Sequence, residues 1–121
     1  MNRKLLAMSL LIALAAVLYA QSSKPLTVTG YLVDNACSEG KDVARAKNHT
    51  TSCALMDSCE KSGYSVVTED NKHYKLSEKG EGMAAELLKN TKTAKGVKVA
   101  VEGNYNGTEL DVTKISEVTD N

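Results

Sequence analysis

The chain has 121 residues, with 15 basic and 15 acidic side chains and a formal net charge of zero. This length supports one domain and is short for two separate hydrophobic cores. No stretch is strongly basic, and aromatic residues make up 4% of the chain, so the charge and stacking features typical of nucleic-acid binding are missing. We therefore expect no nucleic-acid partner.

The first twenty residues have the pattern of an export signal. Arg3 and Lys4 precede a nearly unbroken apolar run over residues 5–18, which is too short for a comfortable membrane span. We predict that residues 1–20 are a signal peptide and that residues 21–121 form the exported domain, with no stable membrane anchor after cleavage. Cleavage would leave 13 basic and 15 acidic side chains, a net charge of −2.

Alternation of apolar and polar residues predicts the strands. Five stretches share this pattern: residues 26–34, 64–68, 73–76, 97–102 and 110–112. Asn106-Gly107 predicts a hairpin between the last two stretches. Gly30, inside the first stretch, predicts a bulge or bend. The alternation changes phase at Ile115, which predicts a second bulge near Thr113 and Lys114.

One amphipathic helix is predicted between the third and fourth strands. Met83, Leu87 and Leu88 recur at helical spacing in a segment that runs to about Thr91. Five strands with a helix after the third is the order of the OB-fold. We therefore predict an all-β fold with one helix: a five-stranded, OB-fold-like Greek-key β-barrel, with a cysteine-rich insertion (residues 35–62) between its first two strands.

Several segments resemble known bacterial proteins. The opening TVTGYLVD strand, the closing VKVAVEGNYNGTELDVTKISEV hairpin and the export signal resemble small periplasmic OB-fold proteins of the BOF-like type. The cysteine block, VDNACS through HTTSCALMDSCEKSGYSVVTEDNKHYKL, is similar to a group of secreted bacterial proteins with no assigned activity. The resemblance covers most of residues 26–118. It implies an OB-fold and a periplasmic or secreted location, and it implies no catalytic residues.

All three cysteines lie in the insertion, and cysteines of exported proteins usually form disulfides. Three pairings are open: Cys37–Cys53, Cys37–Cys59 and Cys53–Cys59. A pair that includes Cys37 would tie the end of the first strand to the far side of the insertion and contribute about 3 kcal/mol. The leading interpretation is a small β-barrel binding module whose insertion is cross-linked by one disulfide. One cysteine is then left over. The partner would be a small ligand, a metal ion or a protein.

The alternative interpretation is a soft-metal site. Cys37, His49, Cys53 and Cys59 form a Cys₃His set, and Met56 adds a thioether. Such donors suit Cu(I) or Zn²⁺ as a cofactor. His49 and Cys53 are four residues apart and would share a face of a continuous helix, but a helix cap at residues 50–52 would break that helix. The cysteine spacing also lacks the C-x₂-C pair typical of zinc sites.

A third interpretation is an enzyme that uses a cysteine or a bound metal. The chain has no thioredoxin-like C-x-x-C pair and no local signature of a cysteine nucleophile. Asp34, just after the first strand, is expected to cap or orient the insertion. His73 is expected to face solvent in a hairpin.

Overall fold

The strands form one antiparallel sheet in the order β3-β2-β1-β4-β5. The computed structural model describes residues 23–38 and 42–119, so the predicted signal peptide lies outside the described residues. The strands are β1 (Lys24–Asp34), β2 (Tyr64–Val67), β3 (His73–Lys75), β4 (Lys98–Tyr105) and β5 (Leu110–Glu117). The helices are α2 (Asn35–Ser38), α3 (Val43–Lys47), α4 (Thr51–Ala54), α5 (Asp57–Lys61) and α6 (Glu78–Asn90). None of these described helices has the length and apolarity needed to cross a bilayer.

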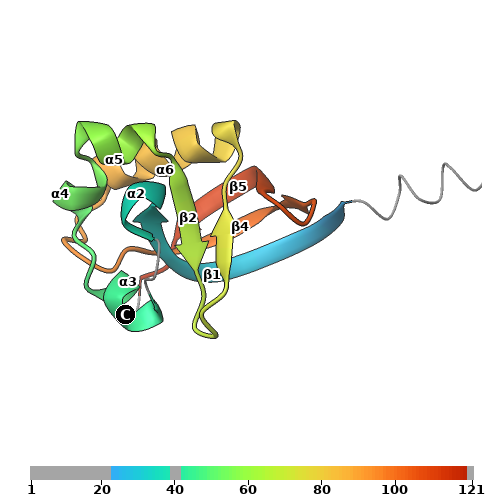
Figure 1. Ribbon diagram of the computed structural model, residues 1–121, viewed down its shortest axis with the longest axis horizontal. Coiled ribbons are helices and arrows are strands. Elements are labelled where there is room, and N and C mark those ends of the chain that lie inside the picture. Colours follow the sequence, from blue (N-terminus) through green and yellow to red (C-terminus); the bar gives the residue numbers. More distant parts are fainter. Residues whose placement is uncertain (1–22, 39–41, 120–121) are drawn as a thin grey trace, which may run out of the picture.

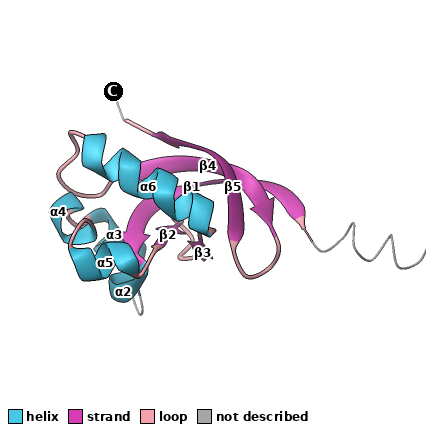
Figure 2. Cartoon of the chain, turned by 90° about the horizontal axis from the view of Figure 1, so that it is seen from above, coloured by secondary structure: helices cyan, strands magenta, loops and turns pink. Residues whose placement is uncertain are grey.

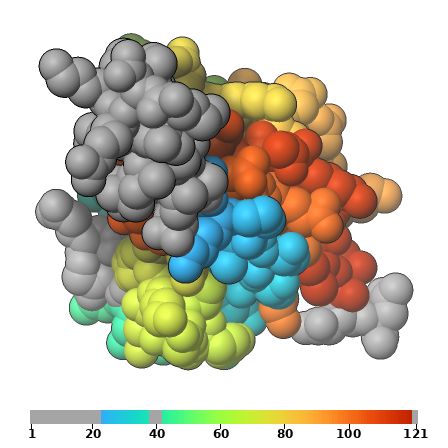
Figure 3. Space-filling model, turned by 90° about the vertical axis from the view of Figure 1, so that its right-hand side faces the viewer, coloured from blue at the N-terminus to red at the C-terminus, as the bar shows by residue number. Residues whose placement is uncertain are grey.

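The long strand β1 is the centre of the sheet. Residues 24–31 pair with β4, and residues 31–34 pair with β2. Figure 3 shows β1, in blue, between the β2–β3 hairpin, in yellow-green, and the orange and red strands β4 and β5. The predicted strands and the hairpin between β4 and β5 are therefore confirmed, and β1 ends at Asp34 where the cysteine-rich segment begins.

The two predicted bulges have different outcomes. Glu102 pairs with Lys114 and Gly103 pairs with Val112, so Thr113 is the extra residue and the bulge predicted there is confirmed. Of the two alternatives at Gly30, a bulge or a bend, the bulge is wrong, because the pairing of β1 with β4 continues unbroken through this residue. A Cβ atom at position 30 would lie 2.4 Å from the carbonyl oxygen of Val67. The glycine therefore allows β2 to approach β1 closely.

Helix α6 lies across one face of the sheet and covers the core (Figure 2). Ala84 and Leu88 are buried against valines of the sheet, including Val101 and Val112. The helix begins at Glu78, earlier than its apolar spacing indicated. The side chain of Ser77 accepts a hydrogen bond from the N–H of Gly80 at 3.2 Å and caps the first turn.

The prediction of a single helix is wrong. The described residues between β1 and β2 form four further helices of four or five residues each. Asp42 caps α3 by accepting from the N–H of Arg45, and Thr50 caps α4 by accepting from the N–H of Cys53. The cap predicted at residues 50–52 is therefore present. Helices this short show no full apolar period, so in the sequence only capping residues such as Thr50 could mark them.

The described strands form an open sheet, and its two edges approach each other at one point. Leu76, which follows β3, forms a single parallel bridge with Leu110 at the start of β5. The N–H of Ser77 donates to the carbonyl oxygen of Leu110 at 2.9 Å. The coarse prediction of a five-stranded antiparallel β-fold is thus confirmed.

Gly96 connects the loop before β4 to the cysteine-rich segment. Its φ is +64°, and a Cβ atom there would lie 2.4 Å from the carbonyl oxygen of Lys47. We expect Gly96→Ala to lower the free energy of unfolding by about 1–3 kcal/mol, because alanine adds both backbone strain and a clash. Gly82→Ala is the matched control, since Gly82 lies on α6 with no atom within 4 Å of its built Cβ. That control should stabilise the protein by about 0.5–1 kcal/mol. Urea unfolding of both variants measures the change in the free energy of unfolding, and equal changes in the two variants would contradict the prediction.

Candidate thiol site

The three cysteines converge at one end of the sheet, where α2, α4 and α5 gather (Figure 1). Cys37 lies on α2, Cys53 on α4 and Cys59 on α5, and their sulfur atoms all lie within 4.8 Å of one another. Cys59 is buried, and the other two are half-buried. All three belong to the described part of the chain, and no disulfide joins them there. They make up the one cluster of three histidine, cysteine or acidic side chains found among the described residues that could hold a metal ion.

Hydrogen bonds between α2 and the end of α5 bring Cys37 and Cys59 together. The N–H of Asn35 donates to the carbonyl oxygen of Gly63 at 2.8 Å, and its side-chain amide donates to that of Ser62 at 2.9 Å. The N–H of Ala36 donates to the hydroxyl of Ser62 at 2.9 Å. Since these partners are 26 to 28 residues apart in sequence, the packing of the segment places the two cysteines beside each other.

Contacts on both sides hold α4, which carries Cys53. The N–H of Thr51 donates to the carbonyl oxygen of Ala94 at 2.9 Å, and its hydroxyl donates to that of Thr93 at 2.6 Å. On the other side, the buried hydroxyl of Tyr64 donates to the carbonyl oxygen of Ala54 at 2.8 Å. Burial, followed by the negative charges nearby, raises the pKa of Tyr64 to about 12, so the phenol remains a donor at neutral pH.

Asp34, at the end of β1, is fully buried and contacts the cysteine-bearing helix α2. Its Oδ1 lies 2.7 Å from Nε2 of His49, and its Oδ2 accepts from the N–H of Cys37 at 3.0 Å. The thiol of Cys59 also donates to this carboxylate. Burial raises the pKa of the Cys59 thiol, and the charge of Asp34 and the hydrogen bond to it raise the pKa further. Cys59 therefore carries a proton at neutral pH until a ligand displaces it.

The other two predicted metal ligands, His49 and Met56, are placed differently from the cysteines. The side chain of His49 is 6% exposed and contacts Asp34, and α3 ends before it, so no continuous helix carries both His49 and Cys53. Met56 immediately precedes α5 and is 57% exposed. The structure thus brings together the three predicted sulfur ligands, with His49 bonded to the carboxylate behind them and Met56 in solvent.

Asp34 and Tyr64 are the site residues whose importance the sequence understated. Asp34 was expected only to cap or orient the insertion, and it does cap α2 through the N–H of Cys37. Its contact with His49 joins residues 15 positions apart. The available signal was the spacing of three between Asp34 and Cys37, which is the spacing of a side-chain cap. No comparable signal marked Tyr64.

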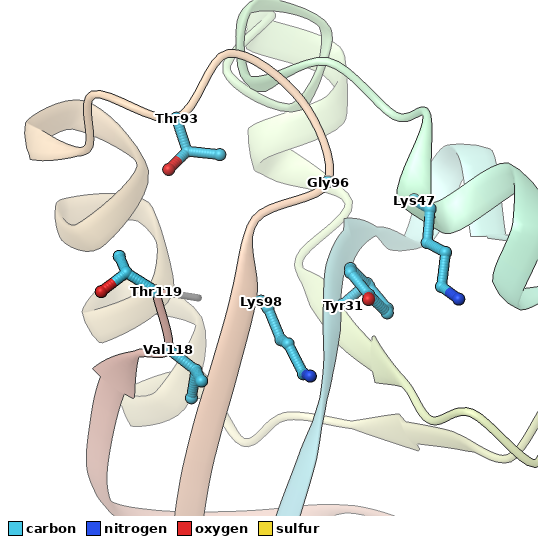
Figure 4. A pocket seen from close by; sticks show the side chains of 7 residues that line it. All are labelled: Tyr31, Lys47, Thr93, Gly96, Lys98, Val118 and Thr119. Atoms are coloured by element: carbon cyan, nitrogen blue, oxygen red, sulfur yellow. The ribbon is translucent and has the colours of Figure 1, made fainter. Parts of the chain in front are cut away.

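A polar hollow is lined by side chains from β1, α3 and β4, among them Tyr31, Lys47 and Lys98 (Figure 4). It has a volume of about 450 Å³. The lining residues are Tyr31, Lys47, Thr93, Gly96, Lys98, Val118 and Thr119. The amine of Lys47 lies 5.6 Å from the centre of the Tyr31 ring and 3.2 Å from Oε2 of Glu69. The hollow contains no thiol or imidazole, and its chemistry is that of ordinary polar surface.

No protein-family model, curated protein or solved structure matches this chain. The chemistry of the thiol site is therefore the guide to what this protein does. Three thiols within 4.8 Å of one another can coordinate one thiophilic ion, or any two of them can be oxidised to a disulfide next to the third.

Proposed function

We propose that this protein is an exported module that binds a soft metal ion through Cys37, Cys53 and Cys59. The observation that supports the proposal most strongly is the convergence of three sulfur atoms from three separate helices to within 4.8 Å. Thiolate sulfur is the donor that Cu(I) and Zn²⁺ select. The three cysteines come from separate helices, and the reactivity of a cysteine, including its metal binding, more often explains its presence than its packing does.

The spacing of the thiols suits one shared ion. A metal–thiolate bond is about 2.3 Å long, so two sulfurs on one ion lie at most about 4.6 Å apart, and about 4.0 Å apart in a trigonal site. The observed limit of 4.8 Å therefore requires a movement of less than about 1 Å. Side-chain rotation alone can supply this movement.

The barrel and the compartment are parts of the same proposal. An OB-type barrel is supported by the strand order and by the bridge between Leu76 and Leu110, which joins the two edges of the sheet. Export to the periplasm or beyond is supported by the basic and apolar pattern of residues 1–20. In OB-folds the loop between the first two strands commonly borders the ligand site, and here that loop carries the thiols.

A second candidate function is favoured by the same proximity. One disulfide between two of the three cysteines would cross-link the segment and leave a binding module with one thiol. A disulfide requires a sulfur–sulfur distance of about 2.05 Å, so the pair would have to approach by more than the metal site requires. The two candidates differ in the number of reducible thiols and in the response to metal.

Intact mass and thiol counting on the exported protein separate the two candidates. Metal binding predicts three reactive thiols and a one-to-one adduct with Zn²⁺ or Cu(I) that protects all three from alkylation. The disulfide predicts one reactive thiol and no adduct. His73→Ala, which changes an exposed histidine in the β2–β3 hairpin, should leave both the thiol count and the adduct unchanged. A protein with one reactive thiol and no metal adduct would rule out the proposed function.

The proposed site predicts metal affinity that rises with pH. The pKa of Cys59 is raised by burial and by Asp34, so the thiol is protonated at neutral pH and the ion must displace that proton. Lowering the pH adds competing protons, and the apparent Kd should increase by up to about tenfold per pH unit for each proton displaced. Chelator competition with Zn²⁺ at pH 6, 7 and 8 measures the change in apparent Kd, and calorimetry measures the number of protons released. An affinity that is constant across this range would contradict thiol coordination.

A further inference from the structure

We propose that the ion is monovalent copper, held by sulfur alone, and that Met56 is the exposed thioether through which it enters. This inference rests on the proposed soft-metal function and specifies its ligand. Three observations support it: three sulfur atoms converge, the imidazole of His49 and the carboxylate of Asp34 contact each other, and Met56 is exposed.

The converging donors are three sulfurs. Among the described residues, no histidine or acidic side chain joins Cys37, Cys53 and Cys59 in their cluster. The nearest imidazole, that of His49, has its Nε2 on Oδ1 of Asp34 at 2.7 Å. Oδ2 of Asp34 accepts from the N–H of Cys37 at 3.0 Å. Nε2 of His49 and both carboxylate oxygens of Asp34 are thus engaged in contacts that position the site.

A set of three sulfurs discriminates between the two candidate ions. Zn²⁺ in proteins almost always takes four donors in a tetrahedron, and commonly completes the set with nitrogen or oxygen. Monovalent copper is a soft, closed-shell ion that thiolates and thioethers select, and three sulfurs satisfy it. The donor count therefore favours Cu(I).

Met56 adds a second kind of soft donor at the surface. It lies three residues from Cys53 and three from Cys59, and it is 57% exposed. A single exposed apolar side chain needs no explanation by itself, but this one is a thioether between two thiol ligands. A thioether binds Cu(I) without losing a proton and has little affinity for Zn²⁺. Because Met56 is exposed, Cys37 and Cys53 are half-buried and Cys59 is buried, an ion arriving from solvent would meet Met56 first, then the two half-buried thiols, and Cys59 last.

The transfer that follows from this order is a ligand exchange without a redox step. Copper remains monovalent. As each bond to a protein sulfur forms, one bond to a sulfur of the donor complex breaks. The proton lost by the cysteine is taken up by the departing thiolate or by the buffer. With the Cu(I) complex of glutathione as donor, the balanced products are copper-loaded protein and reduced glutathione.

Anaerobic measurements on the full exported protein test both parts. X-ray absorption of the Cu(I) form should show three sulfur neighbours at about 2.3 Å and no nitrogen. Cu(I) should displace bound Zn²⁺ in competition. Met56→Leu should leave the equilibrium affinity for Cu(I) unchanged and slow transfer from the glutathione complex by about tenfold or more. Met83→Leu, the same change on α6, which carries none of the three cysteines, should transfer copper at the wild-type rate.

The possible failures are distinguishable. A nitrogen neighbour in the absorption spectrum, or Zn²⁺ that Cu(I) does not displace, would overturn the copper assignment and leave the soft-metal function standing. If Met56→Leu takes up copper from the glutathione complex at the wild-type rate, only the role of Met56 in copper entry would be overturned. A fully reduced protein that binds neither Cu(I) nor Zn²⁺ would overturn the proposed function itself.

Discussion

Replacing any one of the three cysteines with serine is expected to lower the affinity for a soft metal ion by about a hundredfold or more. The hydroxyl of serine keeps the size of the side chain but offers a neutral oxygen in place of a thiolate. Cys59→Ser should preserve the fold best, since its hydroxyl can still donate to Asp34 as the thiol does. Chelator competition with Zn²⁺ and with Cu(I) on the reduced variants measures the loss.

The pattern across the three variants separates metal binding from a disulfide. If the three cysteines share one ion, Cys37→Ser, Cys53→Ser and Cys59→Ser all lose affinity. If two of them form a disulfide, two variants lose about 3 kcal/mol of stability after oxidation and the third loses nothing. Ser52→Ala, an exposed neighbour of Cys53 on α4, is the matched control and should behave as the wild type. A single harmless cysteine variant would contradict the three-sulfur site.

The sheet could be predicted because each strand carries its own signal. The buried valines of β4, Val99 and Val101, alternate with residues that are not buried, and the same alternation marks β1 and β5. Even the bulge at Thr113 was visible, since one extra residue changes the phase of the alternation. The bulge alternative at Gly30 was wrong because a glycine required by a close neighbour has the same local pattern as a glycine in a bulge.

The thiol site could be predicted only as a list of residue types. Its geometry depends on contacts such as those of Asn35 with Ser62 and of Thr51 with Ala94, which join distant positions and leave no periodic signal. The sequence also grouped His49 with the cysteines as a ligand, whereas the structure places its ring on Asp34. Contact with a carboxylate does not by itself separate the two roles, because a histidine that binds metal commonly donates its second ring N–H to a carboxylate. What separates His49 from the cysteines is position, since the cluster within 4.8 Å holds the three sulfur atoms and not its ring.

Asp34→Ala is expected to cause the largest loss of stability, about 3–5 kcal/mol. The carboxylate is fully buried and serves three groups at once: the ring of His49, the N–H of Cys37 and the thiol of Cys59. Alanine would leave these groups in the interior without their acceptor. Since a domain of this size has a total stability of about 5–15 kcal/mol, urea unfolding should detect a clear shift of the midpoint.

Two further variants show which role of Asp34 matters most. Asp34→Asn keeps the shape and one carbonyl oxygen, so it should unfold between the wild type and Asp34→Ala. Asp70→Ala, which removes an exposed carboxylate paired with Lys72 at 3.7 Å, should unfold close to the wild type. The double variant tests whether Asp34 acts through His49. If it does, Asp34→Ala combined with His49→Ala should lower the free energy of unfolding by less than the sum of the two single changes, because each single change already removes the contact between the two side chains. If the two losses of stability simply add, the carboxylate acts on the cysteine helices independently of His49. The thiols would then depend for their placement on the contact of Asp34 with the N–H of Cys37, at the start of α2.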